Sequence, residues 1–287
     1  MEKIIKKLLI IGCGRLGQAV GKVLSKLPLE VIGIKRQLSK NNLPFRLLVL
    51  DIFSESFSKE INFINPDYVL YCVSSDKQTE ESYQKNYVDG LRITIEALNQ
   101  LDNFQHLFFI SSTRVYGQSS ENFLSELTYP QPADYGGRLL FKAEESIKKI
   151  SSKSTILRLS GIYGDNRRYM LEMASDLARW PSEDRWTNRI HEEDIVSFIN
   201  YLFVQIINNE MIESLYLLTD NHPVTLFEVL TWLRAELKLP LENIVIPTQI
   251  NGKKLRSQIL PKLKFSFKHS NYKSGYRQMI SKLNTTN

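Results

Sequence analysis

The sequence has little cysteine and no long apolar run. Its two cysteines among 287 residues, Cys13 and Cys72, cannot build a disulfide framework and have no metal-site spacing. No segment approaches the ~20 apolar residues that a membrane-spanning helix needs. We therefore expect no metal and no membrane partner. The sparse cysteine usage is typical of a protein in a reducing cytoplasm.

Neither positive nor negative charge strongly dominates the chain. Lysine and arginine number 37 against 31 acidic residues, which gives a formal net charge of +6. A modest excess of this kind can attract nucleic acid or phosphorylated small molecules. No signature of a nucleic-acid-binding module accompanies it. We therefore expect a small-molecule substrate and no nucleic-acid partner.

The most informative segment is the glycine turn near the start of the chain. An apolar run at residues 8–11 leads into Gly12, Gly14 and Gly17, and a helical pattern follows at residues 18–27. This is the dinucleotide-binding fingerprint in the context that it requires. The first glycine permits the tight turn, the second lets a pyrophosphate approach the backbone, and the third lets the helix pack close to the strand. The phosphates then meet free N–H groups at the helix N-terminus.

The end of the next predicted strand, residues 29–34, bears on the choice of nucleotide. An NAD site usually has Asp or Glu about 20 residues beyond the glycines, where it binds the ribose 2′-hydroxyl. Here Lys35 and Arg36 occupy that place. A guanidinium there can bind a 2′-phosphate with two parallel hydrogen bonds, or it can be a solvated surface cation. We expect NADP(H) to be preferred, with NAD(H) as the alternative.

Strand and helix patterns alternate through the middle of the chain. Further strands are predicted at residues 46–50, 68–73, 106–110 and 155–159, with helices at 79–101 and after Asp134. This alternation predicts a parallel sheet covered by helices on both faces. Ligands in such sheets bind beyond the carboxyl ends of the strands. The residues expected to line that crevice are Gly12, Lys35, Asp51, Ser74 and Ser111.

Several local patterns resemble those of one family. Residues 86–90 (NYVDG) are similar to its N-V-x-G helix segment, and residues 110–117 (ISSTRVYG) to its S-S-x-x-V-Y-G strand end. Residues 156–164 (ILRLSGIYG) resemble its R-x-x-x-x-Y-G segment. On these motifs the chain resembles the extended short-chain dehydrogenase/reductases, in the NAD-dependent epimerase/dehydratase group that acts mainly on nucleotide sugars. The resemblance runs nearly end to end.

The resemblance implies a tyrosine acid/base and a hydroxyl partner. In this family a tyrosine moves a proton at a substrate hydroxyl while hydride moves to or from the nicotinamide. By position these residues are Tyr135 and Ser112. The alternatives are a half-buried aromatic at a helix start and a turn residue that caps its neighbours. The cofactor-binding residues predicted from the turn, the strand ends and the resemblance are Gly12, Gly14, Arg15, Leu16, Gly17, Lys35, Arg36, Asp51, Ile52, Val73, Ser74, Ser111 and Tyr135.

The chain departs from the family at the catalytic lysine. Four residues after Tyr135 stands Leu139, which can neither lower the pKa of a phenol nor hold a ribose. Arg138 and Lys142 are the cations nearby in sequence, and helical spacing puts both on the face of Tyr135. Arg138 is our candidate for stabilising a tyrosinate, although a guanidinium cannot exchange a proton. The alternatives for Arg138 are a surface cation or a residue that holds backbone or phosphate.

We predict a Rossmann-type, doubly wound α/β fold with a small C-terminal lobe. The cofactor domain is expected at residues 1–160 plus part of 190–220, and the resemblance implies a substrate lobe formed by 161–192 and 220–287. Arginines in the lobe suit a substrate diphosphate because their fork matches phosphate oxygens, whereas a solvated basic surface is the alternative. The residues expected to contact substrate are Thr113, Arg167, Arg168 and Arg189.

Two functions follow from these patterns. The first is an NAD(P)-dependent oxidoreductase, epimerase or dehydratase that acts on a nucleotide sugar or a similar small polar alcohol or carbonyl compound. The second is a catalytically weak NADP(H)-binding sensor or regulatory protein, because the lysine is missing. Family members often pair through two long helices, so a homodimer is also considered. The apolar positions Leu91, Ile95, Leu139 and Phe141 could serve that pairing or cover the sheet.

Overall fold

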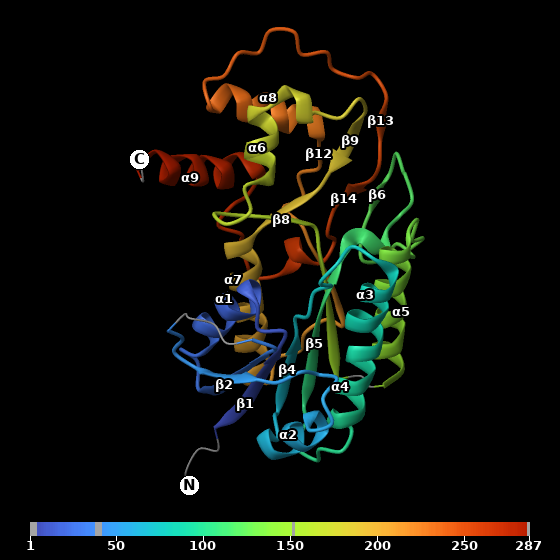
Figure 1. The fold of residues 1–287 in the computed structure, drawn as a ribbon, viewed down its shortest axis with the longest axis vertical. Helices are drawn as coiled ribbons and strands as arrows, with labels where there is room; N and C mark the ends of the chain where they lie inside the picture. Colours follow the sequence, from blue (N-terminus) through green and yellow to red (C-terminus); the bar gives the residue numbers. More distant parts are fainter. Residues whose placement is uncertain (1–4, 38–41, 151–152, 286–287) are drawn as a thin grey trace. The chain divides into compact units, whose positions relative to one another are not determined.

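The computed structural model describes residues 5–37, 42–150 and 153–285, and they form two compact units (Figure 1). The first unit comprises Met1–Val115, Pro132–Arg158 and Phe198–Tyr216. The second comprises Tyr116–Gln131, Leu159–Ser197 and Leu217–Asn287. Residues 116–131 thus cluster with the second unit, whereas the sequence assigned them to the cofactor domain. Which unit binds which ligand stays a prediction.

The first unit is built on a seven-stranded sheet. Its strands are β1 (Lys6–Ile11), β2 (Leu29–Lys35), β3 (Arg46–Val49), β4 (Tyr68–Tyr71), β5 (His106–Ser112), β7 (Ser154–Leu159) and β11 (Leu215–Leu218). Their order is β11-β7-β5-β4-β1-β2-β3. The neighbours from β3 to β5 in this order pair in parallel. The predicted doubly wound α/β fold is confirmed.

Helices cover both faces of this sheet, as the buried strands require. They are α1 (Arg15–Leu24), α2 (Phe57–Ile64), α4 (Gly90–Leu98), α5 (Tyr135–Ile150) and α7 (Glu192–Ile207). Alternate residues of a strand point to opposite faces. Leu9 and Ile11 therefore enter a core shared with α2, α4 and α5. Ile10 points the other way, toward α1, and on β5 Phe108 stacks on Phe203 of α7 with ring centroids 4.8 Å apart.

The helix predicted over residues 79–101 is divided into three pieces. They are α3 (Glu80–Tyr83), a π-helical turn (Gln84–Asp89) and α4. The buried Tyr71 hydroxyl donates to the carbonyl of Asn86 at 2.6 Å. That carbonyl is the α-helical partner of the Gly90 amide, which instead bonds the carbonyl of Lys85. A side chain inserted from β4 therefore causes the π turn.

The start of α1 also differs from the prediction. The helix begins at Arg15 rather than Gln18, because it starts directly after the glycine turn.

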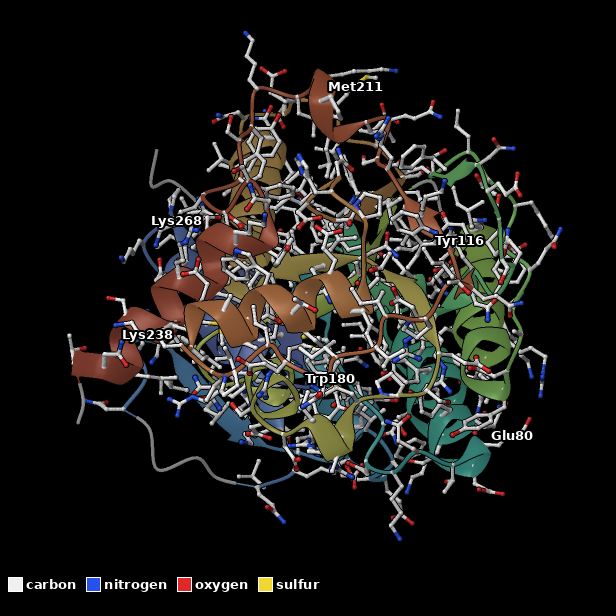
Figure 2. The ribbon with its side chains drawn as sticks, turned by 90° about the horizontal axis from the view of Figure 1, so that it is seen from above. Glu80, Tyr116, Trp180, Met211, Lys238 and Lys268 are labelled. Atoms are coloured by element: carbon white, nitrogen blue, oxygen red, sulfur yellow. The ribbon has the colours of Figure 1, made fainter. Side chains whose placement is uncertain are left out.

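The second unit holds short strands and a helical core. Its elements are β6 (Phe123–Leu124), β8 (Gly161–Tyr163), α6 (Tyr169–Ser175), β9 (Asp184–Thr187), β10 (Arg189–His191), β12 (Val224–Thr225), α8 (Leu226–Glu236), β13 (Ile250–Asn251), β14 (Lys254–Leu255) and α9 (Tyr272–Thr285). Apolar side chains of α6, α8 and α9 form one buried cluster. Trp180, labelled in Figure 2, packs against this cluster. Its indole N–H donates to the carbonyl of Met173 at 2.9 Å.

Two further expectations concern association. Leu91 and Ile95 pack in the core against the sheet, Leu139 is buried, and Phe141 is half-buried. The homodimer stays a prediction. Among the described residues, no helix combines the length and the apolar character needed to cross a bilayer.

The first prediction concerns a buried histidine of β5. The His106 ring nitrogen Nε2 lies 3.0 Å from the Thr155 hydroxyl, which itself donates to the carbonyl of Glu213. The hydroxyl must therefore accept from Nε2–H of a neutral ring. Burial lowers the pKa of His106 to about 4.

Because the unfolded histidine titrates near pH 6.5, its protonation favours unfolding once the pH falls below that value. We expect the unfolding free energy to fall between about pH 6.5 and 4, with His106 accounting for roughly 3 kcal/mol of that fall. Urea unfolding of the wild type and His106→Gln across this range measures the contribution. Parallel pH profiles for the two chains would contradict it.

Candidate functional site

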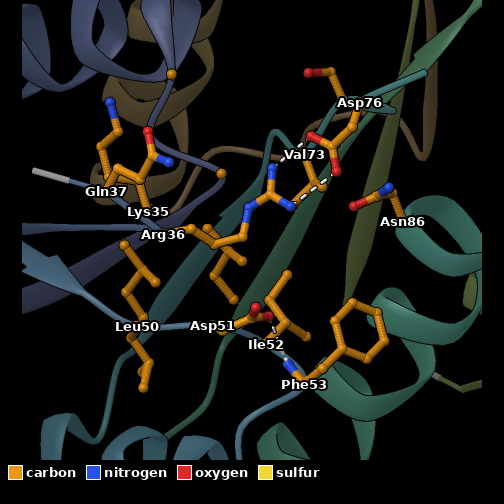
Figure 3. A pocket seen from close by; sticks show the side chains of 15 residues that line it. Lys35, Arg36, Gln37, Leu50, Asp51, Ile52, Phe53, Val73, Asp76 and Asn86 are labelled. Atoms are coloured by element: carbon orange, nitrogen blue, oxygen red, sulfur yellow. Dashed lines mark hydrogen bonds and ion pairs between the residues drawn. The ribbon is translucent and has the colours of Figure 1, made fainter. Parts of the chain in front are cut away.

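A cavity of about 460 Å³ lies in the first unit where β1, β2 and β4 end (Figure 3). Asp76 and Asn86 also line it, although neither was predicted from the sequence to bind the cofactor. The predicted cofactor-binding residues that line it are Gly12, Gly14, Lys35, Arg36, Asp51, Ile52, Val73 and Ser74. Those predicted for the cofactor but outside its lining are Arg15, Leu16, Gly17, Ser111 and Tyr135.

The glycine turn at the cavity has the geometry that a dinucleotide needs. Gly12 has φ +80°, and a Cβ there would lie 2.6 Å from the backbone of Val73. Gly14 is the N-cap of α1 and has no side chain to occupy the first-turn amides. A Cβ on Gly17 would lie 3.1 Å from the side chain of Ile10, so the helix packs close to the strand. No side chain caps the start of α1, and a helix start of this kind suits a diphosphate.

Arg36, which was predicted to bind the cofactor 2′-phosphate, is paired with Asp76 in the structure. Its guanidinium donates to both oxygens of Asp76, at 2.8 and 2.5 Å. This hydrogen bonding raises the pKa of Arg36 and lowers that of Asp76. Asp51 holds the turn after β3 by accepting the amide of Phe53 at 2.9 Å. The cavity therefore carries charges of both signs.

The two serines at the end of β5 are held in different ways. Ser111 is buried and donates to Glu144 at 2.5 Å. Glu144 in turn pairs with Arg158 at 2.5 Å, and both of these side chains are buried. The Ser112 oxygen accepts the backbone amide of Arg114 at 3.2 Å, which is the capping geometry named as the alternative to a catalytic role. The assignment of Ser112 to substrate stays a prediction, as does that of the buried Thr113.

Tyr135 begins α5 as expected. Asp134 caps the helix by accepting the amide of Gly137 at 2.8 Å. The Tyr135 hydroxyl donates to the carbonyl of Gln78 at 2.6 Å, and its ring meets Tyr83 edge-on. The phenol therefore faces the loop between β4 and α3.

The cation beside Tyr135 is Arg114, a residue that sequence reasoning missed. Its guanidinium carbon lies 5.2 Å from the centre of the Tyr135 ring. The same group bonds both oxygens of Asp134 at 3.0 Å and donates to the Tyr83 hydroxyl at 2.7 Å. Arg138, the predicted candidate, is 57% exposed and lies 3.7 Å from Glu80.

Two adjacent glycines make room for Arg114. A Cβ on Gly136 would collide with the guanidinium, and a Cβ on Gly137 would lie 2.6 Å from the Arg114 carbonyl oxygen. Glycine is unfavourable in a helix, so two of them in the first turn of α5 require a packing reason. This pair was the available sequence signal for Arg114. Leu139, which stands at the lysine position, is buried.

A second cavity, of about 570 Å³, lies within the second unit. The predicted substrate residues Arg167, Arg168 and Arg189 line it. Arg189 is buried and donates to the Thr187 hydroxyl at 2.7 Å. Arg167 pairs with Glu192 at 3.3 Å. The structure brings the three arginines together around one hollow with Tyr163, Tyr169 and Tyr276.

A histidine–carboxylate cluster in the second unit has metal-like spacing. His191, Glu193 and His269 offer ligand atoms within 4.8 Å of one another. However, Glu193 already pairs with Lys268 at 2.6 Å. Burial alone would raise the pKa of Glu193, but bonds from its partners lower it to about 2. The Nδ1 of His191 accepts the Glu193 amide, which places any proton of the neutral ring on Nε2. Glu193 is therefore held by its ion pair with Lys268.

Comparison with known proteins gives consistent results. The model of the NAD dependent epimerase/dehydratase family matches residues 8–197. A structure from Methylobacillus flagellatus, named as a candidate NAD-dependent epimerase/dehydratase, has 34% identity and a TM-score of 0.87 over 98% of this chain and 99% of its own. No curated protein matches the chain.

Two more distant structures share the fold. UDP-glucose 4-epimerase of Thermotoga maritima, solved with UDP-glucose, has 15% identity and a TM-score of 0.79 over 98% of this chain and 99% of its own. UDP-glucuronic acid 4-epimerase of Bacillus cereus, solved with NAD, has 17% identity and a TM-score of 0.71 over 96% of this chain and 99% of its own. At these identities the likeness concerns architecture alone.

The contact between Gly136 and Arg114 generates the second prediction. Gly136→Ala should destabilise the wild type by about 1–2 kcal/mol, because the new methyl displaces the guanidinium from its partners. In an Arg114→Ala background the same change should be neutral or stabilising by up to about 1 kcal/mol, since alanine favours helix. Urea unfolding of the four chains gives the coupling energy. Equal costs in both backgrounds would show that the two residues do not interact.

Proposed function

Because the chain belongs to the NAD dependent epimerase/dehydratase family, we propose that it is an NADP(H)-using member acting on a nucleotide sugar or a similar small polar alcohol or carbonyl compound. The observation that carries this proposal is the cavity above Gly12 and Gly14. It joins a turn suited to a diphosphate with a guanidinium at the end of β2.

The preference for NADP(H) rests on Arg36. A guanidinium binds a phosphate monoester through two parallel charge-assisted bonds, which a ribose 2′-hydroxyl cannot match. Lys35 lines the same cavity and adds positive charge to it. NAD(H), the cofactor that the family is named for, is the alternative for this chain.

The proposed chemistry uses Tyr135 as the group that moves a proton. The residues that line the cavity above Gly12 and Gly14 would hold the nicotinamide cofactor, whose chemistry would be hydride transfer at the substrate carbon. Tyr135 would exchange its phenolic proton with the substrate oxygen, which the Ser112 hydroxyl would hold. Arg114 would stabilise the negative charge that forms on the phenol, because its guanidinium already lies against that ring. In this proposal Arg114 supplies the positive charge that the family obtains from lysine.

The nucleotide-sugar substrate is supported by the cavity in the second unit. Arg167, Arg168 and Arg189 supply donors suited to a diphosphate, and Tyr169 is an exposed aromatic side chain. The Thermotoga maritima epimerase binds UDP-glucose, and we extend that ligand class to this chain as part of the proposal.

A second function remains because Leu139 replaces the lysine. Without that group the protein could bind NADP(H) and a ligand with little turnover, as a sensor or regulatory protein. Arg114 favours the enzyme, since it gives Tyr135 a cationic neighbour. A bound nucleotide without turnover would favour the sensor.

The third prediction tests the cofactor. NADPH should bind more tightly than NADH, and Arg36→Ala should weaken NADPH binding about tenfold while leaving NADH binding within about twofold. Titration of nicotinamide fluorescence with each cofactor measures both constants. Tighter binding of NADH to the wild type, or an unchanged NADPH affinity in Arg36→Ala, would overturn the preference.

The fourth prediction tests the chemistry. With UDP-sugars screened as substrates at the nicotinamide absorbance band, Tyr135→Phe should lower turnover about a hundredfold or more. Arg114→Ala should lower it about tenfold, which corresponds to ~1.4 kcal/mol in the barrier. The exposed Arg92→Ala on α4 serves as a control and should retain wild-type turnover. If Arg138→Ala lowers turnover more than Arg114→Ala does, Arg138 rather than Arg114 is the residue that stabilises the tyrosinate.

A further inference from the structure

The Arg36–Asp76 ion pair joins two segments that line the cofactor cavity. Arg36 directly follows β2, whereas Asp76 lies in the loop between β4 and α3. The sheet order places β1 between these two strands. With neighbouring strands about 4.8 Å apart, the pair reaches across the end of the strand that carries the glycine turn. Figure 3 shows the two dashed bonds that join Arg36 to Asp76 among the residues that line the cavity.

The pair is fully formed, yet it is exposed to solvent. Each terminal guanidinium nitrogen donates to a different carboxylate oxygen, so the pair of parallel N–H groups that a phosphate would use end-on is occupied. The Arg36 side chain is 53% exposed and that of Asp76 is 44% exposed. An exposed ion pair of this kind opens at small energetic cost. Asp76 can therefore compete with a ligand without locking the site.

We propose that Asp76 is a specificity-determining residue that competes with the cofactor 2′-phosphate for Arg36. A carboxylate and a phosphate cannot share one guanidinium fork, because each needs the same donors and the two anions repel each other. NADP(H) must therefore displace Asp76, whereas NAD(H) has no phosphate that demands the exchange. The pair thus reduces the preference for NADP(H) that Arg36 alone would give. This inference rests on the proposed recognition of NADP(H) by Arg36.

The displaced carboxylate keeps favourable neighbours. After the bonds from Arg36, the pKa of Asp76 is also lowered by hydrogen bonding to Asn86 and by the charge of Lys85. Both residues belong to the π-helical turn, and Asn86 is held there by its bond to the carbonyl of Ser82 at 2.9 Å. When a phosphate takes Arg36, Asp76 retains these partners. The exchange therefore does not leave an isolated charge.

The experiment tests Asp76→Asn and uses Glu81→Gln as its control. Glu81→Gln makes the same change of net charge, but at an exposed carboxylate that does not line the cavity. NADPH and NADH are titrated into the wild type and both variants by fluorescence, with calorimetry as a second readout. Asp76→Asn should bind NADPH about fivefold more tightly and NADH within about twofold of wild type. Glu81→Gln should change neither affinity by more than about twofold.

The outcomes separate this inference from the proposed function. If Arg36→Ala leaves NADPH affinity unchanged, recognition by Arg36 fails and the competition fails with it. If Arg36→Ala weakens NADPH binding but Asp76→Asn does not strengthen it, only the competition fails. Weaker binding of both cofactors in Asp76→Asn would make the pair a clasp that retains the cofactor and would overturn the proposal. In the Arg36→Ala, Asp76→Asn double variant the gain in NADPH affinity should disappear.

Discussion

The close approach of the β1 turn to β4 is the constraint on which the candidate site depends. At Gly12 the chain turns with φ +80°, and the Val73 backbone fills the space that a side chain would need. The turn therefore stays tight enough for α1 to begin directly after Gly14. The cavity lies above this junction because no side chain of the turn occupies it. Glycine is required by the packing of two strands, and the binding surface is a consequence of that packing.

Leu139 and the glycine pair of α5 both bear on which cation lies beside Tyr135. Leu139 is a buried apolar side chain, so the helix provides no cation to Tyr135 from that position. The glycines at 136 and 137 admit the side chain and the backbone of Arg114 against the same helix turn. The charge near the phenol therefore comes from the segment after β5 rather than from α5. A helix start weakened by glycine is thus compensated by an arginine held on Asp134.

The parts of the structure that sequence predicts are those with local causes. Strand positions follow from short apolar runs, the turn follows from glycine spacing, and Asp134 was recognisable as a helix cap. The parts that sequence missed depend on side chains distant in the chain. The π turn arises because Tyr71 of β4 captures the carbonyl of Asn86. Likewise, the pairing of Arg36 with Asp76 joins two loops that only the strand order brings together.

This last contact changes how a cation after β2 is to be interpreted. From sequence, Arg36 is an available positive charge, because no carboxylate stands beside it. In the fold, β1 lies between β2 and β4. The loop after β4 can therefore place a carboxylate on the guanidinium that follows β2. While the pair is formed, the charges of Arg36 and Asp76 offset each other in the cavity. Under the proposed competition, discrimination between the two cofactors would depend on the residues that flank β1 on both sides, rather than on the single residue that follows β2.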